Sequence, residues 1–361
     1  MADVTLEAQG KRLDPTTLAL LPPGVVSFIQ TNEVASRYHL TQGRLIYRWN
    51  DEEQVNFTGQ TRLIDARGDL GILIDQLQGL LTVDAIQRTT SEWPELKLNL
   101  QASSLRASER LIEPLTLDLH STTQPGLLII PQIKGQVYNG QLHGQGQVQL
   151  GENPGYSLQM TLQDAAVEAM IEPQSWQASQ SRAQLDGSPY AAMAASLSLQ
   201  GIPGNPDSRQ GRGNIDIKQA NLYQTPLALT LLQIISLALP TARSFDRAQA
   251  SYVIDGDVVR FDNIRFETPS IALTGQGTML FSTLELDLNF VTRRTTGPTL
   301  GPLGDLVSVI KDQILAIHVG GTLEQPVTQV KSFSGVGQSW SDVFKGKADT
   351  TTQPASRNAR P

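Results

Sequence analysis

Strands with glycines on their apolar side recur along this chain and constrain its fold more than any other feature. The segment Leu142–Leu150 alternates leucine, glycine, glycine, valine and leucine with polar residues; Leu273–Phe281 repeats the arrangement, and Gly211–Ile217 is a shorter copy. Because successive side chains of a strand point to opposite faces, these glycines share the apolar side. Glycine inside a strand marks sharp bending or close approach of another group. The pattern therefore predicts a strongly curved sheet with an apolar concave face.

Composition and charge exclude several classes of protein. The net charge of −7 argues against nucleic-acid binding, which needs clustered Lys and Arg. The absence of cysteine excludes disulfides, Cys-ligated zinc and thiol catalysis. No apolar stretch reaches the length of a membrane span, and Met1 leads into strand-like sequence without a signal peptide. We expect the chain to be a fragment whose membrane anchor lies upstream.

Most of the remaining sequence predicts short antiparallel strands. Roughly eighteen segments alternate apolar and polar residues, and short turns separate them. Clear examples of strands are Leu96–Leu100, Leu115–Leu119, Leu158–Leu162 and Leu284–Phe290. The turn signals include Asn139-Gly140, Asn153-Pro-Gly155, Asp186-Gly187 and Asp255-Gly256. Two of the glycine-bearing strands precede a strongly alternating strand, which indicates a weak repeat of about 130 residues and a sheet built by addition of strands.

Helices are predicted at a few places only. The segment Pro23 to Ala35 has helical spacing, and Pro302 to Ile314 is amphipathic. The clearest helix runs from Thr225 to Pro240, with a capping threonine, a proline in the first turn and a proline that stops it. It is apolar nearly all round, so it is either a core helix that plugs one end of the sheet or a lid that contacts lipid. The polar tail 346–361 is predicted to be disordered.

The sequence offers no catalytic, metal or cofactor site. The four histidines, His39, His120, His143 and His318, are scattered, and none has metal-ligand spacing. His143 and His318 are expected on a polar, solvated face. The Gly-Gln-Gly pairs lack the third glycine and the following helix that a dinucleotide site needs. The sequence also contains no Gly-x-Ser-x-Gly elbow. We therefore expect a protein that is not an enzyme.

Several segments resemble the C-terminal region of AsmA-like proteins, the bridge-like lipid transfer proteins of the AsmA and TamB type. They are Phe245–Met279, Leu303–Leu306 leading into Ile317–Pro326, the strand turn Gly135–Gly146, and Gly211–Ile217 with the apolar helix after it. In this family a short helix precedes a strand of the form hydrophobic-x-Val-x-Gly-Thr-Leu-x-x-Pro. The resemblance covers roughly residues 130–332.

The resemblance implies a mainly β fold: an elongated, twisted antiparallel sheet curled into a trough, with a few short capping helices. This β-groove region would span residues 1–345. The resemblance also implies a place in the periplasm or cell envelope, anchored in the inner membrane, and phospholipid transport that supports outer-membrane biogenesis. The expected partners are phospholipid, the inner and outer membranes and envelope proteins, with no nucleic acid.

Apolar strand faces and the apolar helix supply the candidate site. The residues expected to line the lipid groove are Leu115, Leu117, Leu142, Val148, Leu158, Met160, Leu162, Ile215, Leu273, Met279, Leu286 and Leu288. The residues expected in the capping or gating helix are Leu227, Leu231, Ile234 and Ile235. No metal ligand and no cofactor is expected.

Two other functions remain open at this stage. The first is an assembly or scaffolding factor for outer-membrane proteins, which would use exposed strand edges. The second is a surface β-protein that binds carbohydrate, which needs aromatic platforms. The tryptophans Trp49, Trp93, Trp176 and Trp340 lie far apart in the sequence, which disfavours that alternative.

Overall fold

The computed structural model describes most of the chain. The described residues are 1–361 without 20, 22, 50–52, 70–72, 108–109, 152, 168, 170–191, 219–226, 228–230, 232–244, 269–270, 295–313, 324 and 334–361. The predicted disordered tail, the Asp186-Gly187 turn and nearly all of the predicted helices 225–240 and 302–314 lie outside this part. Ile314, the predicted end of one helix, instead begins a strand.

The described chain consists almost entirely of strands. The first half contains β1 (Ala2–Arg12), α1 (Pro15–Leu18), α2 (Pro23–Thr31), β2 (Ala35–Trp49), β3 (Glu53–Asp69), β4 (Leu73–Arg88), β5 (Glu95–Ala107), β6 (Arg110–Ile112), β7 (Leu115–Ser121), β8 (Leu127–Val137) and β9 (Gly140–Gln149). The second half contains β10 (Gly155–Ala166), β11 (Ala192–Ile202), β12 (Asn205–Lys218), β13 (Arg247–Asp255), β14 (Val258–Glu267), β15 (Ile271–Leu280), β16 (Leu286–Arg294), β17 (Ile314–Gly321) and β18 (Pro326–Phe333).

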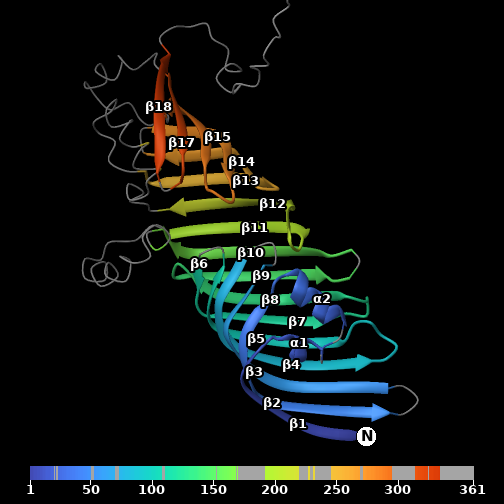
Figure 1. Cartoon of the computed structure of the whole chain (residues 1–361). Helices are drawn as coiled ribbons and strands as arrows, with labels where there is room; N and C mark the ends of the chain where they lie inside the picture. The colour runs from blue at the N-terminus through green and yellow to red at the C-terminus, as the bar shows by residue number, and fades with distance from the viewer. Residues whose placement is uncertain are drawn as a thin grey trace, which may run out of the picture.

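These strands form one antiparallel sheet of 18 strands, which confirms the predicted fold class. Strands pair with their neighbours in sequence, except that β5 pairs with both the short β6 and β7. The sheet is not closed into a barrel: within the described chain β1 pairs only with β2, and β18 only with β17. Figure 1 shows the result, a long twisted ribbon whose strands turn steadily from β1 to β18.

Bulges bend the long N-terminal strands. Register shifts occur at neighbouring positions on four consecutive strands, after Leu6 in β1, Leu40 in β2, Leu63 in β3 and Asp75 in β4. A β-bulge adds a residue on one strand and bends it. Figure 1 shows β2–β4 curving along their length. The curl in this part of the sheet therefore comes from aligned bulges, while the predicted paired glycines lie further along the chain.

Local chemistry shifts several predicted boundaries by a few residues. Tyr138 and Asn139 have φ of 51° and 61°, so they form the β8–β9 turn one residue before the predicted Asn139-Gly140 pair. Leu284 has φ of 56°, and β16 therefore begins at Leu286. Helix α2 ends at Thr31, and the two residues that follow, Asn32 and Glu33, form its C-terminal cap. The Asn32 Nδ2 atom donates to the Phe28 carbonyl at 2.8 Å, and Glu33 takes a left-handed φ of 48°.

The glycine pairs lie against the main chain and large side chains of neighbouring strands. A Cβ at position 144 would lie 3.0 Å from the Gln159 carbonyl oxygen and 3.2 Å from Met160 Cγ. One at position 146 would lie 2.7 Å from the Ser157 carbonyl oxygen and 3.2 Å from Leu158 Cδ1. A Cβ at Gly213 would collide with the Tyr252 phenol, which donates to the Ser196 carbonyl at 3.2 Å. At Gly275 a Cβ would collide with the Phe290 ring. Close approach, one of the two predicted roles of these glycines, is thus their role in β9, β12 and β15.

We expect Gly213→Ala to destabilise the fold by about 1–3 kcal/mol, because the added methyl group overpacks the site beneath the Tyr252 ring. The matched control is Gly155→Ala, where the nearest atom to a Cβ lies 3.7 Å away and the change is expected to be nearly neutral. Urea unfolding of both variants measures the difference. Equal stabilities would show that the glycine does not accommodate the ring.

An ion pair on the opposite face makes a pH-dependent contribution to stability. Asp216 on β12 accepts hydrogen bonds from Arg247 Nε at 3.0 Å and Nη2 at 3.3 Å, and Lys218 Nζ lies 3.5 Å from its Oδ2. Burial opposes ionisation, but the hydrogen bonds and charges of Arg247 and Lys218 outweigh it and hold the Asp216 pKa below 3.8. Because the Asp216 pKa is lower in the folded than in the unfolded state, the carboxylate stabilises the fold at a pH above the unfolded-state pKa. This contribution is lost as the pH falls through the folded-state pKa.

Asp216→Asn is therefore expected to lower the urea midpoint at neutral pH, and its difference from the parent chain is expected to shrink as the pH falls from about 7 towards about 2. Urea titrations of both chains across this pH range measure the convergence. A difference that persists unchanged at low pH would contradict the ionic origin of the effect.

Candidate functional site

Cross-strand register brings every predicted groove residue onto one face of the sheet. Directly opposed residues of an antiparallel pair share a face, so the pairings trace continuous rows from strand to strand. Row A contains Ala102, Leu115, Gly135, Leu142, Leu162, Ala195, Ile215, Ala250, Ile264, Gly275, Phe290 and Ile317. Row B contains Leu81, Leu100, Leu117, Ile133, Gly144, Met160, Leu197, Gly213, Tyr252, Phe261, Gly277, Leu288 and Val319.

A third row completes this surface. Row C contains Ile130, Gly146, Leu158, Leu199, Gly211, Ile254, Val259, Met279 and Leu286. Val148 lies beside row C, opposite Tyr156, and Leu273 lies beside row A, opposite Phe266. We call this surface the apolar face. Every row member is apolar or glycine, so an uninterrupted apolar strip runs across the strands.

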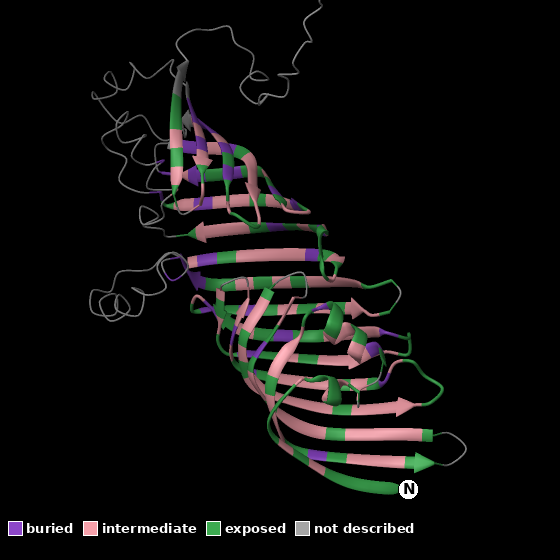
Figure 2. Cartoon of the chain, in the orientation of Figure 1, coloured by how far each residue is buried: buried purple, intermediate pink, exposed green. Residues whose placement is uncertain are grey.

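Exposure divides the apolar face into an open part and a closed part. Leu117, Leu158 and Met160 are only partly buried, as are Val148, Leu162, Ile215 and Met279. In β15 and β16, by contrast, Leu273, Leu286 and Leu288 are 0%, 5% and 2% exposed. Leu115 and Leu142 are also buried, at 7% and 6%. Figure 2 shows this division, with buried positions frequent on β13–β17 and intermediate ones along β2–β4.

A compact cluster closes the C-terminal part of the apolar face. Phe245 and Leu231 are both fully buried and pack in one cluster with Phe290 and Val319. The rings of Phe245 and Phe266 lie 5.1 Å apart. Leu227, a predicted capping residue, packs against the same cluster, while Ile234 and Ile235 lie outside the described residues. Of the two readings of the apolar helix, the core reading fits the complete burial of Leu231.

Several residues of the apolar face were not predicted from the sequence. Ile130 and Ile133 both face this side because a bulge separates them in β8, which breaks the alternation of the run Leu127–Pro131. Leu197 and Leu199 on β11 did alternate with serine and glutamine, a signal that was present in the sequence. Tyr252 was hidden because an aromatic with a polar tip fits either face of a strand.

The opposite face of the sheet is polar and carries its own shallow hollow of about 780 Å³. Its side chains come mainly from β9–β13 and include Gln145, Gln159 and Arg212. Gln145 and Gln159 hydrogen-bond to each other at 3.1 Å across the strands. His143 is exposed and His318 partly so, both on this side, as predicted. Amides and hydroxyls that satisfy one another form a surface that remains hydrated.

The described residues offer no candidate metal-ligand cluster and no candidate membrane-spanning helix. No group of three or more His, Asp or Glu residues there is arranged to hold a metal ion. Among the same residues, no helix has both the length and the apolar character that a bilayer crossing requires. No family model, no curated protein and no solved structure matches the chain. The functional proposal that follows therefore rests on the geometry of the apolar face and on the resemblance to AsmA-like proteins.

Because the natural sequence has no cysteine, single cysteines can report the open and closed parts. We expect Met160→Cys to react readily with a water-soluble maleimide, and Leu288→Cys to react at least about 100-fold more slowly, since a buried thiol reacts only after local opening. The measurement is the labelling rate under native conditions, with urea-unfolded protein as the reference. Equal native rates would contradict the division of the apolar face.

Proposed function

We propose that this protein is a non-enzymatic conduit for phospholipid between the inner and outer membranes, in support of outer-membrane biogenesis. The observation that carries the proposal is the apolar face. It continues from strand to strand along rows A, B and C, in a sheet that is not closed into a barrel. A soluble sheet normally buries such a face against a second layer. Here Leu117, Leu158 and Met160 on the central strands remain partly exposed, which suits an occupant that comes and goes.

The energetics of lipid transfer match such a surface. A two-chain phospholipid carries about 30 methylenes, and each costs about 0.8 kcal/mol on exposure to water. Moving the bare chains through water therefore costs about 24 kcal/mol. Contact with a continuous apolar strip removes most of this cost while the charged headgroup stays wet. Neither sliding nor solvation requires a reacting group, so the proposed protein is not an enzyme.

Strand spacing sets the length of the sheet. Neighbouring strands lie about 4.8 Å apart, so a sheet with this number of strands extends about 85 Å. The proposed lipid path is shorter, because the cluster around Phe290 closes the apolar face on the C-terminal strands. The polar face, rich in glutamine, serine and threonine, keeps the other side of the ribbon hydrated. In this proposal the protein works in the periplasm or cell envelope, as the resemblance to AsmA-like proteins implies.

A second function is favoured by the free edges of the sheet. Val4 on β1 and Val327 and Val330 on β18 are 44%, 60% and 47% exposed. An unpaired edge with exposed apolar residues can accept a further strand. This would suit an assembly factor for outer-membrane proteins. Co-purification of a β-barrel protein without bound phospholipid would favour that alternative.

Photo-crosslinking in cells tests the lipid conduit. A benzophenone amino acid at Leu117 or Met160, on the open apolar face, is expected to capture phospholipid. The matched control is the same probe at Thr161, the next residue after Met160, which is exposed on the polar face. A probe at Leu288, which is 2% exposed, should capture none. Absence of lipid at both open positions would contradict the conduit.

We also expect Met160→Arg to block lipid transfer between vesicles by at least about tenfold while the chain stays folded, because the long side chain can bring its charge to water at an open face. Leu286→Arg places a charge inside the closed cluster and is expected to unfold the C-terminal strands instead. Transfer assays and circular dichroism separate the outcomes. Unchanged transfer by folded Met160→Arg would argue against acyl chains on row B.

A further inference from the structure

A small cavity of about 330 Å³ lies where the apolar face meets the start of α2. Tyr47, Val55 and Gln87 lie directly opposite one another on β2, β3 and β4 and form one wall of it. Their positions continue the alternation of the apolar face. Pro23, the first residue of α2, lines the cavity as well. The cavity therefore lies on the same side of the sheet as the proposed lipid path, near the ends of these strands.

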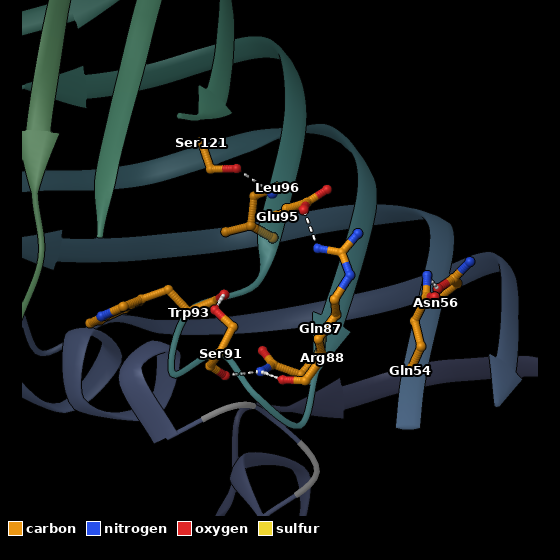
Figure 3. Close-up of polar contacts among 9 residues, drawn as sticks. All are labelled: Gln54, Asn56, Gln87, Arg88, Ser91, Trp93, Glu95, Leu96 and Ser121. Atoms are coloured by element: carbon orange, nitrogen blue, oxygen red, sulfur yellow. Dashed lines mark hydrogen bonds and ion pairs between the residues drawn. The ribbon is translucent and has the colours of Figure 1, made fainter. Parts of the chain in front are cut away.

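The hydrogen-bond donors of Gln87 and Ser91 are already used within the protein. Gln87 Nε2 donates to the main-chain carbonyls of Arg88 at 2.9 Å and of Ser91 at 2.5 Å, as Figure 3 shows. Ser91 Oγ donates to the Trp93 carbonyl at 2.7 Å. The Gln87 Oε1 atom, in contrast, is buried and has no hydrogen-bond partner among the described residues. A buried acceptor of this kind is costly unless a donor reaches it.

The other donors around the cavity are also engaged. Thr89 Oγ1 donates to the main-chain carbonyl of Glu53 at 3.1 Å. The Arg88 guanidinium forms an ion pair with Glu95, drawn in Figure 3. Burial, together with the charge of Glu53 and a hydrogen bond to it, raises the pKa of the Tyr47 phenol. The Tyr47 hydroxyl thus keeps its proton and interacts with the Glu53 carboxylate.

The remaining polar groups of the lining carry negative charge. The carboxylates of Glu53 and Glu92, both exposed residues, border the cavity, whereas the buried Gln87 Oε1 atom has no surface that a molecule in the cavity can reach. The helix end contributes no N–H group through its lining residue, because Pro23 has none. Such a lining is complementary to a ligand that brings hydrogen-bond donors and a positive charge.

We infer that this cavity binds the primary ammonium headgroup of an amine-headed phospholipid whose acyl chains lie on the apolar face. The inference rests on the proposed lipid conduit and specifies its cargo. The Tyr47 ring lines the cavity and lies 5.8 Å, centroid to centroid, from the Trp49 ring, which is 55% exposed. Aromatic faces attract cations, and carboxylates favour an ammonium that can donate hydrogen bonds over a trimethylated one.

Lipid uptake from mixed vesicles tests this inference. The full chain is incubated with vesicles of equal phosphatidylethanolamine and phosphatidylglycerol, re-isolated, and its extracted lipid is quantified by mass spectrometry. We expect phosphatidylethanolamine to be enriched about three- to fivefold, the range of a partly exposed charge pair. A second mixture, with phosphatidylcholine in place of phosphatidylglycerol, should also favour phosphatidylethanolamine.

One variant removes a proposed ligand, and two serve as controls. Glu53→Gln is nearly isosteric and should bring the extracted lipids close to the vesicle ratio while total lipid stays constant. Tyr47→Phe keeps the ring and the Glu53 carboxylate and should keep the enrichment. Glu7→Gln removes another exposed carboxylate, on β1, and should also leave the enrichment intact. Circular dichroism verifies that each chain is folded, so that loss of enrichment reports the headgroup site.

The outcomes separate the two proposals. Lipid recovered at the vesicle ratio by the parent chain would overturn the headgroup site and leave the conduit standing. No recovered lipid in any mixture would overturn both. A last experiment measures the binding of soluble phosphoethanolamine by calorimetry. If the chain binds this compound but shows no preference among lipids, the cavity binds a free amine, and the lipid assignment is overturned.

Discussion

Main-chain hydrogen bonding in register is the constraint on which this molecule depends. Every strand is held mainly by the ladder to its neighbours, and each ladder fixes which side chains share a face. A shift of one residue would move a whole strand's apolar set to the polar side. Rows A, B and C exist because the registers of successive ladders agree, from Leu100 in β5 to Val319 in β17. The candidate site is therefore a property of pairing over the whole sheet, and no single residue makes it.

Glycine and bulges solve different problems in this sheet. Gly213 and Gly275 leave space for the Tyr252 and Phe290 rings of the neighbouring strands. The apolar face can therefore hold large side chains without steric overlap. The aligned register shifts of β1–β4 supply the bend. The glycines can be recognised in the sequence, whereas a bulge adds one residue to a strand and has no sequence motif. Curvature was thus predicted, and its location in the N-terminal strands was not.

Alternation of side chains made much of the architecture predictable. The leucine-rich segments 158–162 and 115–119 predicted strands and their apolar sides correctly, because period-two patterning reports half-burial directly. The sequence did not predict which of these residues are fully buried: Met160 and Leu288 look alike in their patterns, yet Leu288 is 2% exposed and Met160 is only partly buried. The cavity at Gln87 was also hidden, since its polar groups come from β2, β3, β4 and the β4–β5 connection.

The free outer strands have a mechanical consequence. Because the hydrogen bonds of each ladder run along the length of the ribbon, tension between its two ends loads the ladders in series. Ladders in series carry equal force, so a sheet with two free edges opens first at its weakest ladder. A molecule of this build could tolerate fluctuations in the distance between whatever holds its two ends.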